Sequence, residues 1–72
     1  MIMSDMEYLE WLWKQTINKC THCQPKLIRH SNNYYEIQNY SEKDMLFIDC
    51  FKDILIFKYG CKVQLGVKVY DH

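Results

Sequence analysis

The sequence has no alanine, only one arginine and one proline, and only two glycines among its 72 residues. With glycine confined to positions 60 and 66, the chain has no glycine-rich loop of the kind that holds a phosphate group. It also has no excess of charge, because nine basic residues balance nine acidic ones. A neutral chain has little long-range attraction for nucleic acid or for anionic lipid, and both kinds of partner are therefore disfavoured.

Long hydrophobic runs are missing as well. The longest, Met45–Ile48 and Ile54–Phe57, have four residues each, whereas a membrane-spanning helix needs about 20. The first ten residues carry acidic side chains where a secretory signal peptide carries basic ones. We therefore expect a cytoplasmic protein that has no membrane contact and whose four cysteines remain reduced.

The remaining composition describes one small domain over residues 1–72. A chain of this length buries only about 60% of its unfolded surface, so its core is marginal by itself. Hydrophobic residues make up 49% of the sequence and aromatic residues 15%, which favours a partner protein or a second copy of the chain. The scarcity of alanine, glycine and arginine is typical of an AT-rich genome and suggests a phage or mobile-element accessory protein.

The N-terminal region predicts an amphipathic helix over residues 5–19. Ser4 and Glu7 have the spacing of a capping box, in which each residue satisfies an amide of the first turn. At helical spacing, one stripe faces the core: Met6, Leu9, Leu12, Trp13, Thr16, Ile17 and Cys20. Trp11 and Tyr8 lie outside the stripe. Trp11 either covers a sheet edge or serves as a partner-binding residue, a role in which tryptophan is over-represented.

The rest of the chain predicts strands over 26–30, 34–40, 45–51, 54–57 and 61–70. The last is the clearest, because apolar and polar residues alternate without a break from Cys61 to Tyr70. Gly60 fits the left-handed position of a three-residue hairpin loop. The predicted fold is therefore α+β, with the N-terminal helix packed on an antiparallel sheet of four or five strands in meander order. Ser41–Asp44 also resembles a capping box, and this leaves open a short helix over Asp44–Lys52.

The hairpin register of this sheet gives it one apolar face under the helix, and it makes Cys50 and Cys61 buried core residues. The opposite face carries four large apolar side chains, Phe47, Phe51, Ile54 and Ile56. Such a patch is near the largest that a soluble monomer exposes. We predict that these four residues, together with Trp11, bind a partner protein or a second copy. The alternative is that residues 34–40 fold over the patch.

One motif suggests a metal site. Cys20 and Cys23 have the spacing of a zinc knuckle, with His22 between them and His30 nearby. These four residues are the ligands of an alternative interpretation, a small structural zinc-binding domain, and no other cofactor is expected. Thioredoxin-like redox chemistry is disfavoured, because the cysteines follow a helix C-terminus, whose negative pole opposes thiolate formation.

No catalytic set is visible, since the three histidines are scattered and lack a nucleophile and an orienting group at a recognisable spacing. A second alternative is a nucleic-acid-binding domain with Lys58, Lys62, Lys68 and Tyr70 on the last hairpin, although lysines on an exposed sheet face have the same pattern. The leading prediction is a non-catalytic protein-binding module, a small accessory inhibitor or adaptor that acts on a larger partner or forms a homodimer.

Overall fold

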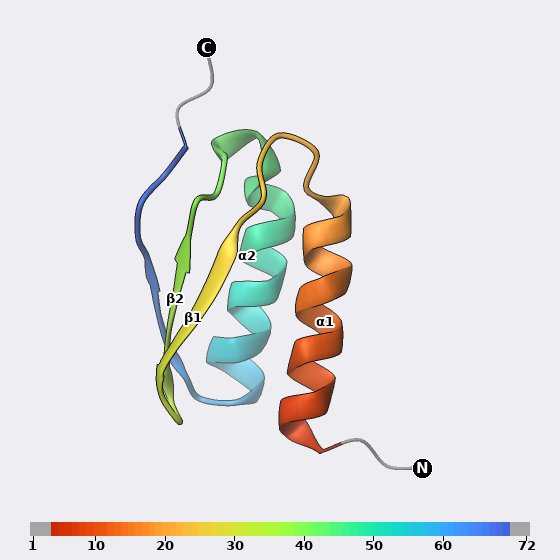
Figure 1. Cartoon of the computed structure of the whole chain (residues 1–72). Helices are drawn as coiled ribbons and strands as arrows, with labels where there is room; N and C mark the ends of the chain where they lie inside the picture. The colour runs from red at the N-terminus through yellow and green to blue at the C-terminus, as the bar shows by residue number, and fades with distance from the viewer. Residues whose placement is uncertain (1–3, 70–72) are drawn as a thin grey trace.

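The computed structural model describes residues 4–69, which form two layers: a sheet of three strands, and two helices packed against one of its faces (Figure 1). Along the chain these are α1 (Asp5–Lys19), β1 (Lys26–Ser31), β2 (Tyr34–Gln38), the 3₁₀ turn η1 (Glu42–Asp44), α2 (Met45–Asp53), the π-helical turn η2 (Ile54–Lys58) and β3 (Lys62–Leu65). The predicted α+β class is therefore correct.

Helix α1 begins and ends where the sequence predicts. The Ser4 side chain accepts a hydrogen bond from the Glu7 amide at 3.2 Å, and Asp5 and Glu7 stabilise the positive end of the helix. The Glu7 carboxylate accepts from the Ser4 hydroxyl rather than from an amide, so only half of the capping box forms. Within the predicted stripe, Leu9 and Thr16 are buried, and Trp13 packs against Phe51 with 4.9 Å between ring centroids.

The sheet has the order β1-β2-β3, and its two pairings differ in direction. β1 and β2 form an antiparallel hairpin, as predicted for strands over 26–30 and 34–40, with Asn32 and Asn33 in the turn between them. β3 instead runs parallel to β2, and an isolated parallel bridge between Tyr40 and Lys68 extends the pairing. Parallel neighbours require a crossover, and the segment 42–58 supplies it. The predicted meander of four or five antiparallel strands is therefore wrong.

Residues 45–58 account for this error, because they are helical where two strands were predicted. Ile48, Phe51 and Leu55 recur at helical spacing, and all three are buried. Ser41 accepts a hydrogen bond from the Lys43 amide and begins the helical segment. The alternative of a short helix over Asp44–Lys52 is therefore close to the observed α2, but it did not include the continuation through Ile54–Lys58. Gly60 has the positive φ expected of it, 66°, but it ends a helix rather than a hairpin loop.

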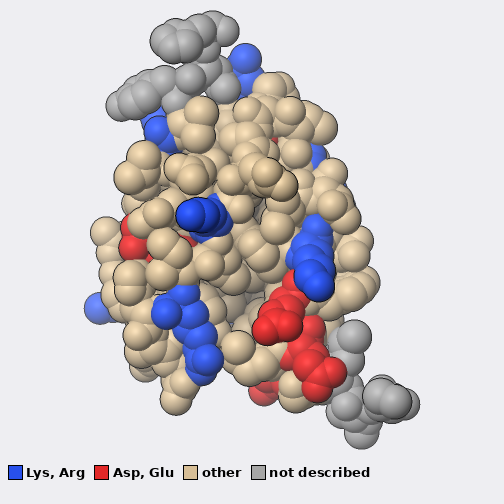
Figure 2. All heavy atoms as spheres, viewed as in Figure 1, with Lys and Arg blue, Asp and Glu red and all other residues tan. Residues whose placement is uncertain are grey.

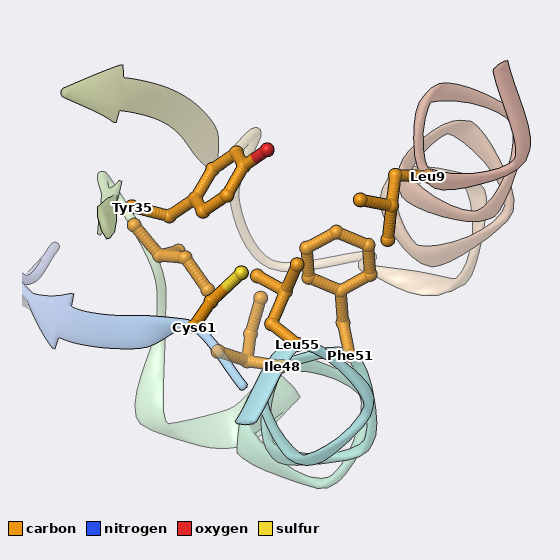
Figure 3. Packing of buried hydrophobic residues seen from close by; sticks show 7 residues of the cluster. Leu9, Tyr35, Ile48, Phe51, Leu55 and Cys61 are labelled. Carbon is orange, nitrogen blue, oxygen red and sulfur yellow. The ribbon is translucent and has the colours of Figure 1, made fainter. Parts of the chain in front are cut away.

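The core lies between the helices and the sheet (Figure 3). It consists of seven buried apolar residues drawn from both layers: Leu9, Tyr35, Ile37, Ile48, Phe51, Leu55 and Cys61. Cys61 was predicted to be buried and is. Cys50 was predicted to be buried too, but it is exposed, because in a helix it lies nearly opposite Ile48 rather than on the same face as in a strand.

Within residues 4–69, the structure contains no helix that is long and apolar enough to cross a membrane.

Candidate protein-binding surface

The outer side of helix α2 and η2 exposes large apolar side chains. Leu46 is 71% exposed and Phe57 is 82% exposed. They are 11 positions apart, which is about three turns of helix, so both lie on the side opposite the buried Ile48 and Leu55. Cys50 and Asp53 are exposed on the same side. We use the name helical face for the surface formed by Leu46, Cys50 and Phe57 together with Phe47 and Ile54.

A groove of about 180 Å³ lies between α1 and α2, and Cys50, on the same side of α2 as Leu46, is among its lining residues. Phe47 and Ile54, both half-buried, form its α2 side, and Leu12 and Thr16 form its α1 side. Buried Phe51 contributes to its floor. Two of the predicted partner-binding residues, Phe47 and Ile54, therefore lie together beside the exposed side chains, although as helix residues and not as strand residues.

Aromatic side chains extend the apolar surface along α1. Trp11 is 47% exposed, and its ring stacks on that of Tyr8 at a centroid distance of 6.2 Å. The ammonium group of Lys58 lies 4.8 Å from the centre of the Tyr8 ring, so a cation–π contact joins η2 to α1. Trp11 itself is partly open to solvent, as expected for a residue outside the core-facing stripe.

The other predicted partner-binding residues lie elsewhere. Phe51 is only 1% exposed and belongs to the core. Ile56 is half-buried and does not line the groove between the helices. The predicted patch required 45–51 and 54–57 to be strands with alternate side chains on one face; in a helix those side chains point in different directions. In the predicted strand register, Leu46 and Phe57 share the helix-covered face with Cys50 and Cys61, so they were not expected to be exposed; a helical spacing of the apolar residues would have found them.

A buried carboxylate connects the loop after α1 to the start of α2. Asp44 is 1% exposed; its Oδ2 accepts from the His22 amide at 3.1 Å and its Oδ1 lies 3.0 Å from His22 Nδ1. Cys23 Sγ donates to Oδ2 at 3.7 Å. Burial alone raises the pKa of Asp44, but the hydrogen bonds from the His22 ring and from backbone amides outweigh it and lower the pKa below its ordinary value.

The cysteines of the predicted zinc knuckle lie around this carboxylate. Burial, together with the negative charges of Asp44 and Cys23, raises the pKa of the Cys20 thiol to about 11. A thiol of this kind stays protonated and is a poor nucleophile at neutral pH. His30 lies apart, on the sheet, where its Nε2 is 2.7 Å from Glu36. Among residues 4–69, no three histidine, cysteine or acidic side chains are arranged to hold a metal ion.

The uncovered face of the sheet carries a polar network. Glu36 at its centre accepts from Gln38 at 2.8 Å and contacts His30, and hydrogen bonds from these two residues lower its pKa. The His30 ring stacks on Tyr34 at 4.9 Å. Gly66 lies against the Glu36 carboxylate, where any side chain would displace it.

The lysines of the predicted basic stripe do not gather on this face. Lys58 lies over Tyr8 on α1, Lys62 is on β3, and Lys68 pairs with Glu42 at 2.6 Å. Tyr70 lies outside the described residues.

Comparison with known proteins gives no further guide: no family model, no curated protein and no solved structure matches the chain.

Proposed function

We propose that this protein is a non-catalytic protein-binding module, an accessory inhibitor or adaptor of phage or mobile-element type, that contacts a larger partner through its helical face. The observation that carries the proposal is the exposure of Leu46 and Phe57 on one side of α2 and η2, at 71% and 82%. Fully burying one such side chain contributes about 1.5–3 kcal/mol. A partner that covers both side chains removes from water an apolar surface that contributes nothing to the fold of the single chain.

The surroundings of these two residues support the same proposal. Trp11 and Tyr8 provide aromatic contact area, and such residues are enriched among those that dominate binding energy. The half-buried Phe47 and Ile54 provide a groove into which a partner side chain can insert. Phe57 lies in a π-helical turn, and such turns occur frequently at functional sites.

The electrostatics are also those expected of a protein partner. Asp49 and Asp53 are exposed on α2, and Lys52 lies 4.0 Å from Asp49. An apolar centre with mixed charges at its edge is typical of protein interfaces. We propose that the protein acts in the cytoplasm, since no disulfide joins the four cysteines in residues 4–69 and Cys50 is exposed.

The test compares two acidic substitutions at apolar residues of similar exposure. Phe57→Glu lies on the helical face, whereas Val67→Glu, at a residue 65% exposed, lies on the segment after β3. Tagged wild type and both variants are incubated with lysate of the cell that encodes the protein, and bound proteins are quantified by mass spectrometry. We expect one bound protein to be reduced at least tenfold by Phe57→Glu and to be retained by Val67→Glu.

A second copy of the chain is the other partner to be measured. Sedimentation velocity at several concentrations reports self-association of the wild type, and Phe57→Glu should abolish any dimer that uses the helical face. Both variants should keep the far-ultraviolet circular dichroism and the unfolding midpoint of the wild type, because neither residue is buried. Identical bound proteins and identical sedimentation for all three chains would show that the helical face is not a binding surface.

A further inference from the structure

A second groove lies on another part of the molecule, between α1 and the edge strand β1. It has a volume of about 440 Å³, which is within the range of ligand-binding clefts. Its walls are apolar, with Leu9, Trp13 and Ile17 from α1, Leu27 from β1 and Tyr35 from β2. Figure 2 shows the surface hollowed along this seam. We call it the β1 groove.

The strand beside the groove has an open edge. β1 is the first strand in the order β1-β2-β3, and β2 is its neighbour on one side only. Within residues 4–69, no backbone group of β1 bonds to a segment other than β2. Alternate amide and carbonyl groups of β1 therefore point toward solvent, directly beside an apolar groove, and such an edge can accept a further strand.

Two basic side chains and one acidic side chain line the groove. Arg29 and Lys14 line it on its β1 and α1 sides, and Lys26 begins β1. None of these three is ion-paired with a carboxylate of residues 4–69. Glu10 also lines the groove, one turn of α1 before Lys14. Figure 2 shows basic side chains on both sides of the hollow and acidic ones toward one end.

This charge argues against a second copy as the occupant. Antiparallel pairing of β1 with β1 of another chain, in the register centred on Arg29, would place Arg29 of both chains directly opposite each other on the helix-covered side. Like charges directly opposite each other on neighbouring strands destabilise the pairing. The occupant that fits is an extended segment of opposite charge.

We propose that the β1 groove binds an extended acidic segment of a partner protein, which adds to β1 as a further strand of the sheet. Leu27 and Arg29 pair with Ile37 and Tyr35 and so lie on the helix-covered side of β1. In the bound segment, the side chain that points toward the helices beside Leu27 is therefore apolar. The side chain two residues further along the segment also points inward, and it is a carboxylate that lies between Arg29 and Lys14. This site is separate from the helical face and does not depend on it.

The test uses a blocked heptapeptide, Thr-Val-Glu-Glu-Thr-Val-Thr, and its analogue with lysine in place of both glutamates. Titration into ¹⁵N-labelled protein is followed by amide chemical shifts. We expect the acidic peptide to shift the amides of 26–31 and of the groove side of α1, and to bind about tenfold more tightly than the lysine peptide, a difference of about 1.4 kcal/mol. Lys14→Glu combined with Arg29→Glu should reverse the preference, because the groove then carries negative charge at both positions. The fold should be retained, since both residues are exposed and lie outside the core.

Backbone pairing is tested separately from charge. Two further acidic peptides carry N-methyl groups on alternate residues, odd in one and even in the other. Strand addition requires that one of them loses binding and the other retains it, since only one set of amides faces β1. Equal binding of both, equal binding of the acidic and lysine peptides, or no shift at 26–31 would overturn the proposal. Phe57→Glu should leave peptide binding unchanged. A negative result for the β1 groove can therefore be distinguished from a negative result for the helical face.

Discussion

At the scale of single residues, Asp44 is the side chain with the most specific structural role. It immediately precedes α2, where a helix usually has a capping side chain, yet it makes no cap hydrogen bond to α2. Both carboxylate oxygens are instead directed to His22, in the loop that follows α1. One buried charge therefore connects the end of the first helix to the beginning of the second.

Asp44→Asn should destabilise the fold by about 2 kcal/mol at pH 7, because hydrogen bonds to a charged group contribute about 1.5–3 kcal/mol. The pKa of Asp44 is lowered in the folded state. Its contribution is therefore complete above the ordinary aspartate pKa of about 3.9 and is lost as pH falls through the lower folded value. Urea unfolding of both proteins at pH 7 and at pH 3 measures the difference. A gap between wild type and variant that widens at pH 3 would contradict this role.

At the scale of elements, α1 shows how its two tryptophans differ although only two positions separate them. Trp13 packs on Phe51 and lines the β1 groove, whereas Trp11 contacts Tyr8 and is 47% exposed. A helix of about 15 residues is marginal by itself in water. The packing of one face, and not intrinsic propensity, therefore keeps α1 in place.

Trp13→Ala should lower the free energy of unfolding by about 3 kcal/mol through lost packing, and Trp11→Ala by less than about 0.5 kcal/mol. The two variants are matched controls for each other, because they remove the same side chain from the same helix. Denaturant unfolding monitored by circular dichroism gives both values. Losses of similar size at the two positions would mean that α1 has a different rotational orientation.

The elements that the sequence predicts correctly are those with one dominant local signal. The cap at Ser4 and the helical stripe define α1, and Asn32 and Asn33 mark the β1–β2 hairpin. Residues 45–58 have no such signal, because a short apolar run fits a buried strand and a buried helix equally well. Gly60 does not resolve the choice, since a left-handed glycine ends a helix as readily as it forms a hairpin loop.

The prediction of the candidate surfaces depended on whether residues 45–58 were taken as strands or as a helix. The position of Trp11 outside the core-facing stripe was predicted because it required only the period of one helix, and Trp11 is exposed. Leu46 and Phe57 were missed, because their exposure follows from α2 being a helix and from η2 being a widened turn. The β1 groove could not be predicted from any short stretch. It requires knowledge that β1 is an edge strand, and strand order is a property of the whole chain.

At the scale of the whole molecule, one small core holds both layers together. Its seven residues come from α1, β2, α2, η2 and the residue before β3. No second core is present among residues 4–69 that could remain folded if this one is disrupted. Substitution in the core should therefore affect the stability of every element at once.

Two leucines of the same helical segment test this. Leu55→Ala removes a fully buried side chain and should cost about 2–5 kcal/mol, which is a large part of the stability of so small a domain. Leu46→Ala removes an exposed one and should change stability by less than about 0.5 kcal/mol. Thermal unfolding followed at both far-ultraviolet and tryptophan wavelengths should give one coincident transition. Separate transitions for the two signals would show that the layers unfold independently.

The position of β2 in the middle of the sheet affects the order in which the chain can fold. Its antiparallel neighbour β1 ends at Ser31, three positions before β2 begins, whereas its parallel neighbour β3 starts only at Lys62. The first pairing closes a short loop and is fast, but the second requires the whole segment 39–61 to be arranged. During synthesis, β2 therefore has an unpaired edge until the C-terminal strand has emerged. A chain that is interrupted before Lys62 lacks β3 and leaves that edge available to other unfolded chains.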